Sequence, residues 1–123
     1  MNEKRNQSSE DYLEQILLLS KQGAEVHRID VAKALGVSGA AVNKAMKLLV
    51  EKGLVYEDGM HLRLTAEGEK YANEVFERHC IIRAFLEKLG VATRWAEEDA
   101  CKMEHLVSEE TFAAMKKFVK KQS

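Results

Sequence analysis

The feature that most constrains this chain is a short helical segment, a glycine-containing turn and a second helical segment, followed at once by a hairpin signal. Apolar residues at helical spacing predict helices over residues 29–35 and 39–52, with Gly36 in the turn between them. Two stretches of strand-forming residues, 54–57 and 61–65, then flank an Asp-Gly-Met sequence, which is typical of a β-hairpin. This order predicts a winged helix-turn-helix near the N-terminus.

The rest of the chain also has helical periodicity, and no proline interrupts it. Ser8 is expected to cap the first helix, and the second helix of the turn is expected to face inward through Val42, Met46, Leu49 and Val50. Further helices are expected over residues 8–23, 65–89, 94–106 and 108–119. We therefore expect a mainly α fold, with a winged helix-turn-helix DNA-binding domain over residues 1–66 and a helical domain over residues 67–123.

The composition is that of an ordinary globular protein of 123 residues. It is 46% hydrophobic and 32% charged, and no apolar run approaches the roughly 20 residues of a membrane span. The polar N-terminus lacks the apolar core of a secretion signal. Two cysteines are too few for a disulfide scaffold. These observations predict a cytoplasmic protein without a membrane partner.

Charge is distributed unevenly, although the net charge of −1 by itself favours no partner. Between Arg28 and Lys52 there are five basic side chains and two acidic ones, whereas residues 97–110 are acidic. This asymmetry suits one module that faces phosphates and another that binds a cation, although two ordinarily solvated surfaces would also account for it.

The residues that open the second helix of the turn are the candidates for reading DNA, because a recognition helix meets base edges with its first residues. Asn43 can pair with adenine, and Lys44 can contact guanine acceptors or phosphate. Arg28 and Lys47 are better placed for phosphates, which position a protein without reading sequence. The simpler alternative is a helical hairpin with a polar face. The complete set of DNA-binding candidates is Arg28, Ser38, Ala40, Ala41, Asn43, Lys44 and Lys47.

A second constellation follows near the C-terminus, where a thiol, a carboxylate and an imidazole recur at i, i+3 and i+4. On a helix these three side chains share one face and offer ligands to a divalent transition metal. Each candidate alone has a simpler explanation as a surface carboxylate, a core cysteine or a structural histidine. Ligands from three helices would clamp those helices around the ion. The candidates are Cys101, Glu104 and His105, with the pair Asp11 and Glu14 on the first helix and His79 on the long one.

From Ser8 to about Val119 five segments, at residues 9–16, 29–38, 64–68, 78–79 and 99–108, carry a family likeness. Together they resemble the diphtheria-toxin-repressor family of metal-dependent transcriptional regulators, which includes the manganese transport regulators. The resemblance implies a homodimeric repressor that binds operator DNA when Mn²⁺ or Fe²⁺ is bound and controls metal-uptake genes. It implies that the six candidate ligands form the regulatory metal site, and that the helices after the wing form the dimerisation region.

The sequence departs from both branches of that family. The iron-sensing branch has a methionine at the place of Asp11 and a cysteine matching Cys101. The manganese branch matches Asp11 and Glu14 but has a glutamate where Cys101 stands. Thiolate softness favours Fe²⁺, Co²⁺ or Zn²⁺, whereas the extra carboxylates suit Mn²⁺. The ligand set is therefore a hybrid, and Co²⁺ or Zn²⁺ could substitute for the activating metal.

The iron branch also has an ancillary site, which uses the histidine equivalent to His79 and an acid four residues later. Arg83 occupies that second position here, and its fixed positive charge disfavours another cation. Glu97 lies one turn before Cys101 and could partly substitute for the missing acid.

Two other functions are compatible with parts of the sequence. A metal-independent winged-helix regulator could sense a small molecule or thiol oxidation at Cys101. A cysteine hydrolase could use Cys101 and His105, but the sequence has no glycine-rich oxyanion turn and no third orienting group, so we expect no enzymatic activity. A purely structural dimerisation module is disfavoured by the recognition-helix and wing pattern.

Overall fold

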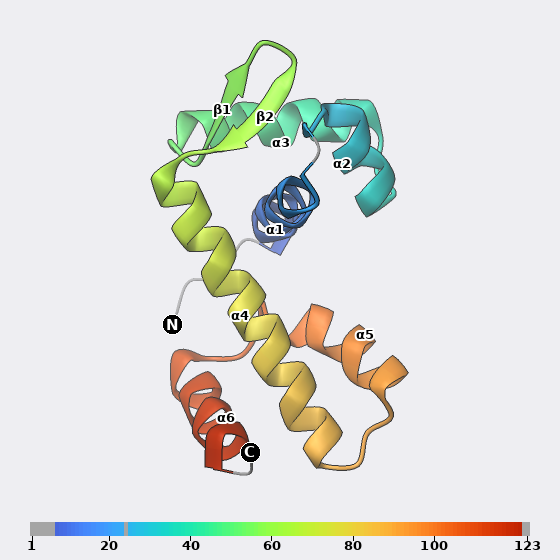
Figure 1. Ribbon diagram of the computed structural model, residues 1–123, viewed down its shortest axis with the longest axis vertical. Helices are drawn as coiled ribbons and strands as arrows, with labels where there is room; N and C mark the ends of the chain where they lie inside the picture. The colour runs from blue at the N-terminus through green and yellow to red at the C-terminus, as the bar shows by residue number, and fades with distance from the viewer. Residues whose placement is uncertain (1–6, 24, 122–123) are drawn as a thin grey trace. The chain divides into compact units, whose positions relative to one another are not determined.

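The computed structural model describes residues 7–23 and 25–121 (Figure 1). The chain forms two compact units, one ending at Asn73 and the next beginning at Glu74. No helix among the described residues has the length and apolar character needed to cross a membrane. The elements are α1 (Gln7–Lys21), α2 (Arg28–Leu35), α3 (Gly39–Glu51), β1 (Val55–Asp58), β2 (His61–Leu64), α4 (Ala66–Lys88), α5 (Thr93–Met103) and α6 (Glu109–Lys121).

The mainly helical architecture and the order helix, turn, helix, hairpin are confirmed. Local capping explains why α2 and α3 are separate helices. The Asp30 carboxylate accepts the backbone N–H of His27 at 2.9 Å before α2, and Gly36 ends α2 with a φ of 66°. Ser38 caps α3, as expected, by accepting the backbone N–H of Ala41 at 3.1 Å.

The part of the first unit's core that α3 contributes is apolar. Val42, Met46 and Leu49 are fully buried along one face of α3. Val50 is 43% exposed, so its predicted inward position is wrong. It follows Leu49 directly and therefore points about 100° away around the helix. Ser8 was expected as the N-cap of the first helix, but α1 already begins at Gln7, which makes Ser8 a helical residue.

The hairpin is antiparallel, with Val55 opposite Leu64 and Asp58 opposite His61. Its strands start or end one residue away from the predicted positions. Leu62 in β2 is buried and donates its backbone N–H to the carbonyl of Val26 at 2.8 Å, which ties the wing to the segment before α2.

The Thr-Ala-Glu-Gly sequence that opens α4 has two structural functions. The Thr65 hydroxyl donates to the carbonyl of Gly53 at 2.7 Å and accepts the backbone N–H of Gly68 at 3.0 Å. A Cβ on Gly68 would overlap the backbone carbonyl of Leu54. Only glycine therefore allows the first turn of α4 to lie so close to the segment that leads into β1.

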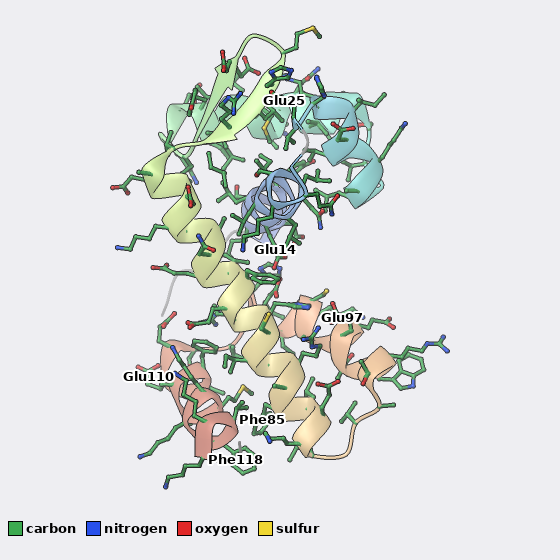
Figure 2. All side chains as sticks on the ribbon, in the orientation of Figure 1. Glu14, Glu25, Phe85, Glu97, Glu110 and Phe118 are labelled. Atoms are coloured by element: carbon green, nitrogen blue, oxygen red, sulfur yellow. The ribbon has the colours of Figure 1, made fainter. Side chains whose placement is uncertain are left out.

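In the second unit Ile82, Ala100 and Phe112 form the buried centre. Phe85 of α4 and Phe118 of α6 make an edge-to-face contact, with their ring centroids 5.5 Å apart (Figure 2).

Arg78 closes the turn between α5 and α6 and is almost completely buried. Its guanidinium donates to the backbone carbonyl of Glu104 at 2.8 Å, to that of Val107 at 2.6 Å and to Glu109 Oε1 at 3.1 Å. The helix predicted to reach residue 106 ends at Met103, and the backbone then turns, with the N–H of His105 donating to the carbonyl of Lys102 at 3.4 Å. α6 then starts where expected, with Ser108 accepting the backbone N–H of Thr111 at 3.1 Å.

Candidate metal centre and nucleic-acid interface

His79 is the centre of a cluster of metal-ligating groups in the second unit. It lies on α4 with its side chain 8% exposed. Its Nδ1 is 2.9 Å from Glu104 Oε2 and 3.8 Å from Cys101 Sγ. Its Nε2 lies 2.8 Å from Glu97 Oε1. The structure therefore brings three of the predicted ligands together, and it adds Glu97, for which the sequence offered only its one-turn spacing from Cys101.

The end of α5 sets the positions of the remaining ligands. Cys101 lies in the last turn and is exposed, whereas Glu104 and His105 follow the helix and are 1% exposed. His105 Nε2 is 3.2 Å from Glu104 Oε1. Because Arg78 binds the backbone carbonyl of Glu104, this turn has a defined conformation. Arg78 was not recognised as a site residue from the sequence, although the adjacent Arg-His pair was part of the family resemblance.

The electrostatics of this cluster favour a positive charge at His79. The Cys101 thiol and the Glu104 carboxylate raise the pKa of His79 to about 11. Burial acts to raise the pKa of Glu97, but the hydrogen bond from Arg83 and the charge of His79 outweigh it and lower that pKa.

The donor set fits a divalent transition metal. Glu104 Oε2 is fully buried and makes no hydrogen bond of good geometry with the described part of the chain, although His79 Nδ1 is nearby. A buried carboxylate oxygen, an imidazole nitrogen and a thiol sulfur that face one another are suitable ligands for Mn²⁺, Fe²⁺, Co²⁺ or Zn²⁺. A bound dication would compensate for the burial of this carboxylate.

Asp11 and Glu14, the other two predicted ligands, lie one turn apart on α1 in the first unit. Neither Cys80 nor Cys101 forms a disulfide in the structure.

The predicted DNA-reading residues lie on or beside α3. Ala40, Asn43, Lys44 and Lys47 are exposed and Ala41 is half-buried, whereas the Ser38 hydroxyl is used to cap the helix. Accessible side chains on the first turns of α3 are consistent with a recognition helix.

Arg28 has a local function that the sequence did not reveal. Its guanidinium donates to Asn43 Oδ1 at 2.6 Å and pairs with the carboxylate of Glu57 in the wing. Arg28, Asn43, Lys47 and Glu57 line a surface groove of about 340 Å³. The expected phosphate contact of Arg28 would therefore compete with two intramolecular partners.

Comparison with known proteins gives two family matches. The N-terminal DNA binding domain of iron dependent repressors matches residues 6–61, and the metal binding and dimerisation domain of iron dependent repressors matches residues 65–123. The chain belongs to the iron-dependent repressor family. This assignment confirms the resemblance and identifies the chain as a metal-dependent transcriptional regulator. The metal-independent alternative is therefore not favoured.

Individual relatives agree with this assignment. The transcriptional regulator MntR of Escherichia coli O6:H1 is 43% identical over 118 residues, covering 95% of this chain and 76% of that protein. An HTH-type transcriptional regulator of Methanocaldococcus jannaschii is 37% identical over 119 residues, covering 94% of this chain and 95% of that protein. These relatives are transcriptional regulators, a class distinct from enzymes.

Among solved structures, the manganese regulator SloR superposes with a TM-score of 0.81 at 29% identity, covering 96% of this chain and 55% of that one. A manganese-dependent transcriptional repressor in complex with manganese gives a TM-score of 0.80 at 28% identity, covering 90% of this chain and 52% of that one. The chain thus spans about half the length of these two structures.

Proposed function

We propose that this chain is a homodimeric repressor that binds operator DNA when Mn²⁺ or Fe²⁺ is bound and thereby controls genes for metal-ion homeostasis in the cytoplasm. The observation that carries the proposal is the convergence of His79 Nδ1, Glu104 Oε2 and Cys101 Sγ. These residues lie in the part of the chain that matches a metal binding and dimerisation domain. The relatives support the assignment, because they include the transcriptional regulator MntR and the manganese regulator SloR.

The proposed ligand set joins two groups of side chains. His79, Cys101, Glu104 and His105 would hold the ion from the helical domain, and Asp11 and Glu14 would complete the set from α1. The ion supplies positive charge that offsets the mutual repulsion of the three carboxylates. Binding of the ion to a site built only in the folded chain would make metal affinity part of the conformational free energy.

We assign DNA binding to a domain over residues 1–66, and dimerisation and metal binding to a domain over residues 67–123. In a dimer the two recognition helices must lie about 34–36 Å apart to enter successive major grooves. Asn43 and Lys44 would read bases, while Arg28 and Lys47 would contact phosphates. Because coupling between sites is reciprocal, operator DNA should tighten metal binding by the same factor as metal tightens DNA binding, typically ~5–150-fold.

The hybrid ligand set leaves two metal classes for the experiment to separate. The thiol of Cys101 favours Fe²⁺, Co²⁺ or Zn²⁺, and the carboxylates favour Mn²⁺. We therefore propose an anaerobic DNA-binding titration of the full chain with each of these ions and with a chelator.

The expected result is operator binding that requires metal and is abolished by the chelator. Cys101→Ala should weaken activation by metal, whereas Lys44→Ala should weaken DNA binding and leave the metal affinity of the DNA-free protein unchanged. Equal operator affinity with chelator and with saturating metal would contradict the proposal. Loss of DNA binding on treatment with peroxide, without any effect of chelator, would favour the thiol-oxidation alternative.

A further inference from the structure

The two ring nitrogens of His79 have different surroundings. Nδ1 faces Glu104 Oε2 at 2.9 Å and Cys101 Sγ at 3.8 Å, which are the two best-placed ligand atoms. Nε2 points instead to Glu97 Oε1 at 2.8 Å. The side of the ring that carries Nδ1 is therefore rich in metal ligands, and the opposite side is occupied by a single carboxylate.

That carboxylate is itself held in place. Glu97 Oε2 accepts a hydrogen bond from Arg83 Nη1 at 3.1 Å. His79 and Arg83 are one turn apart on α4, and Glu97 and Cys101 are one turn apart on α5. Glu97 is labelled in Figure 2. The two helices thus present matched pairs of side chains, and the contacts link Arg83 to Glu97 and Glu97 to His79.

We propose that Glu97 is a positioning residue of the metal centre, which keeps the proton of His79 on Nε2 so that Nδ1 is the nitrogen that binds the metal. Arg83 orients Glu97 for this purpose. The inference rests on the proposed function, because it takes His79 to be a ligand. A metal-bound histidine typically donates its other ring N–H to a carboxylate, which fixes the tautomer and the orientation of the ring.

The competing interpretation is that Glu97 binds the metal directly. Atoms of His79, Glu97 and Cys101 lie within 4.8 Å of one another, which is compatible with such a site. Two contacts argue against it. Each oxygen of Glu97 already has a partner, and the guanidinium of Arg83 provides a fixed positive charge next to the carboxylate, where a dication would be repelled.

This arrangement also suggests why Arg83 occupies its position. A carboxylate held only by His79 could rotate toward the ion and become a ligand. The guanidinium neutralises Glu97 and holds it by its outer oxygen, so the acid remains a hydrogen-bond acceptor for the ring. Both residues are about half exposed, with side-chain accessibilities of 40% for Arg83 and 46% for Glu97, and their substitution should leave the core intact.

The test measures metal affinity with Co²⁺ as the probe, because a cobalt–thiolate bond to Cys101 gives a charge-transfer absorption in the near ultraviolet. Glu97→Ala in the full chain should bind Co²⁺ about 10–100-fold more weakly, since loss of an outer-shell partner typically has this effect. The number of ions bound and the thiolate absorption should be unchanged. Glu97→Gln should restore part of the affinity, because its amide oxygen can still accept from Nε2. Glu98→Ala, an exposed neighbour on α5, is the matched control.

A second measurement identifies the nitrogen directly. With Zn²⁺ bound, long-range ¹H–¹⁵N NMR correlations of His79 should show the proton on Nε2 in the unsubstituted protein, and Glu97→Ala should weaken this preference. Unchanged Co²⁺ affinity in Glu97→Ala, or metal found on Nε2, would overturn the positioning role. Loss of one bound ion in Glu97→Ala would identify Glu97 as a direct ligand instead. If the unsubstituted chain bound none of these ions, the proposed function itself would fail.

Discussion

The wing and recognition-helix segment, residues 25–64, and the segment from Arg78 to His105 differ in what they bury. In residues 25–64 every buried side chain is apolar, as at Val31 and Met46. The later segment buries four polar or charged side chains, which are Arg78, His79, Glu104 and His105. Hydrophobic burial is favourable by itself, whereas a buried charge needs partners with the right geometry. The buried side chains of the first segment therefore stabilise the fold by themselves. Burial of charged groups in the second segment is unfavourable, and a bound cation could offset that free energy.

The largest expected effect tests whether the polar interior of the second segment is held by Arg78. Arg78→Met would leave the backbone carbonyls of Glu104 and Val107 without their guanidinium donor. We expect a loss of about 3 kcal/mol or more in the free energy of unfolding, because each unsatisfied buried polar group costs ~1–3 kcal/mol. Urea unfolding measures this change, with exposed Arg94→Met as the control. A loss no greater than that of the control would mean that the turn is held by other contacts.

The next effect concerns metal and stability. Adding the activating ion at about 100 times its Kd should raise the free energy of unfolding by roughly 2.7 kcal/mol, because the ion binds the folded state. Glu104→Gln removes the buried charge and should abolish most of this increase. Thermal unfolding with and without metal measures both changes. If metal raised the free energy of unfolding equally in the unsubstituted protein and in Glu104→Gln, Glu104 would not be a ligand.

In the compact unit that contains the first segment, the most sensitive position is at the start of α4, where space, not charge, is limiting. Gly68→Ala would push a methyl group into the carbonyl of Leu54, and we expect a loss of about 2 kcal/mol from overpacking. Gly39→Ala is the matched control, because among the described residues no atom beyond the adjoining chain and helix backbone lies within 4 Å of the added Cβ, and its backbone does not need glycine. It should be neutral or stabilising. Equal denaturation midpoints for the two variants would show that α4 can shift to accommodate the methyl group.

The pH dependence of the metal-free protein should reflect the second segment. The pKa of His79 is raised from 6.5 to about 11, so above pH 6.5 the folded state keeps a proton that the unfolded state releases. This contribution is complete below pH 6.5 and is lost as the pH rises toward 11. In that window stability should fall by at most about 1.4 kcal/mol per pH unit. His79→Gln should give a flatter profile in chelator-treated samples, and an identical slope would contradict the assignment.

The same contrast explains how much could be predicted from the sequence. The fold of the first segment follows from local rules, such as the Ser38 cap, the Gly36 turn and the hairpin, and its errors are local ones, as at Val50. Such rules act over a few residues and can be read directly from their order.

Less of the candidate metal centre could be predicted, because its decisive contacts are not local. The i, i+3, i+4 pattern indicated Cys101 and Glu104 as candidates, but α5 ends at Met103, and Arg78, 26 residues before Glu104, binds the backbone carbonyl of Glu104. The pairing of Glu97 with His79 likewise depends on how α4 and α5 pack. Spacing identifies candidate ligands, whereas the nitrogen of His79 that faces them depends on the tertiary structure.

The smallest expected effect is one in which the two compact units should not differ. Ser38 and Ser108 cap α3 and α6 through the same hydrogen bond, from a backbone N–H three residues later, at 3.1 Å in both cases. Substitution of either serine by alanine should cost about 1 kcal/mol, because both caps satisfy one exposed backbone donor. Chemical denaturation of the two variants without metal checks this equality. A clearly larger loss for Ser108→Ala would mean that this cap also supports the turn around Arg78, and that local rules extend further into the metal-binding unit than its buried charges suggest.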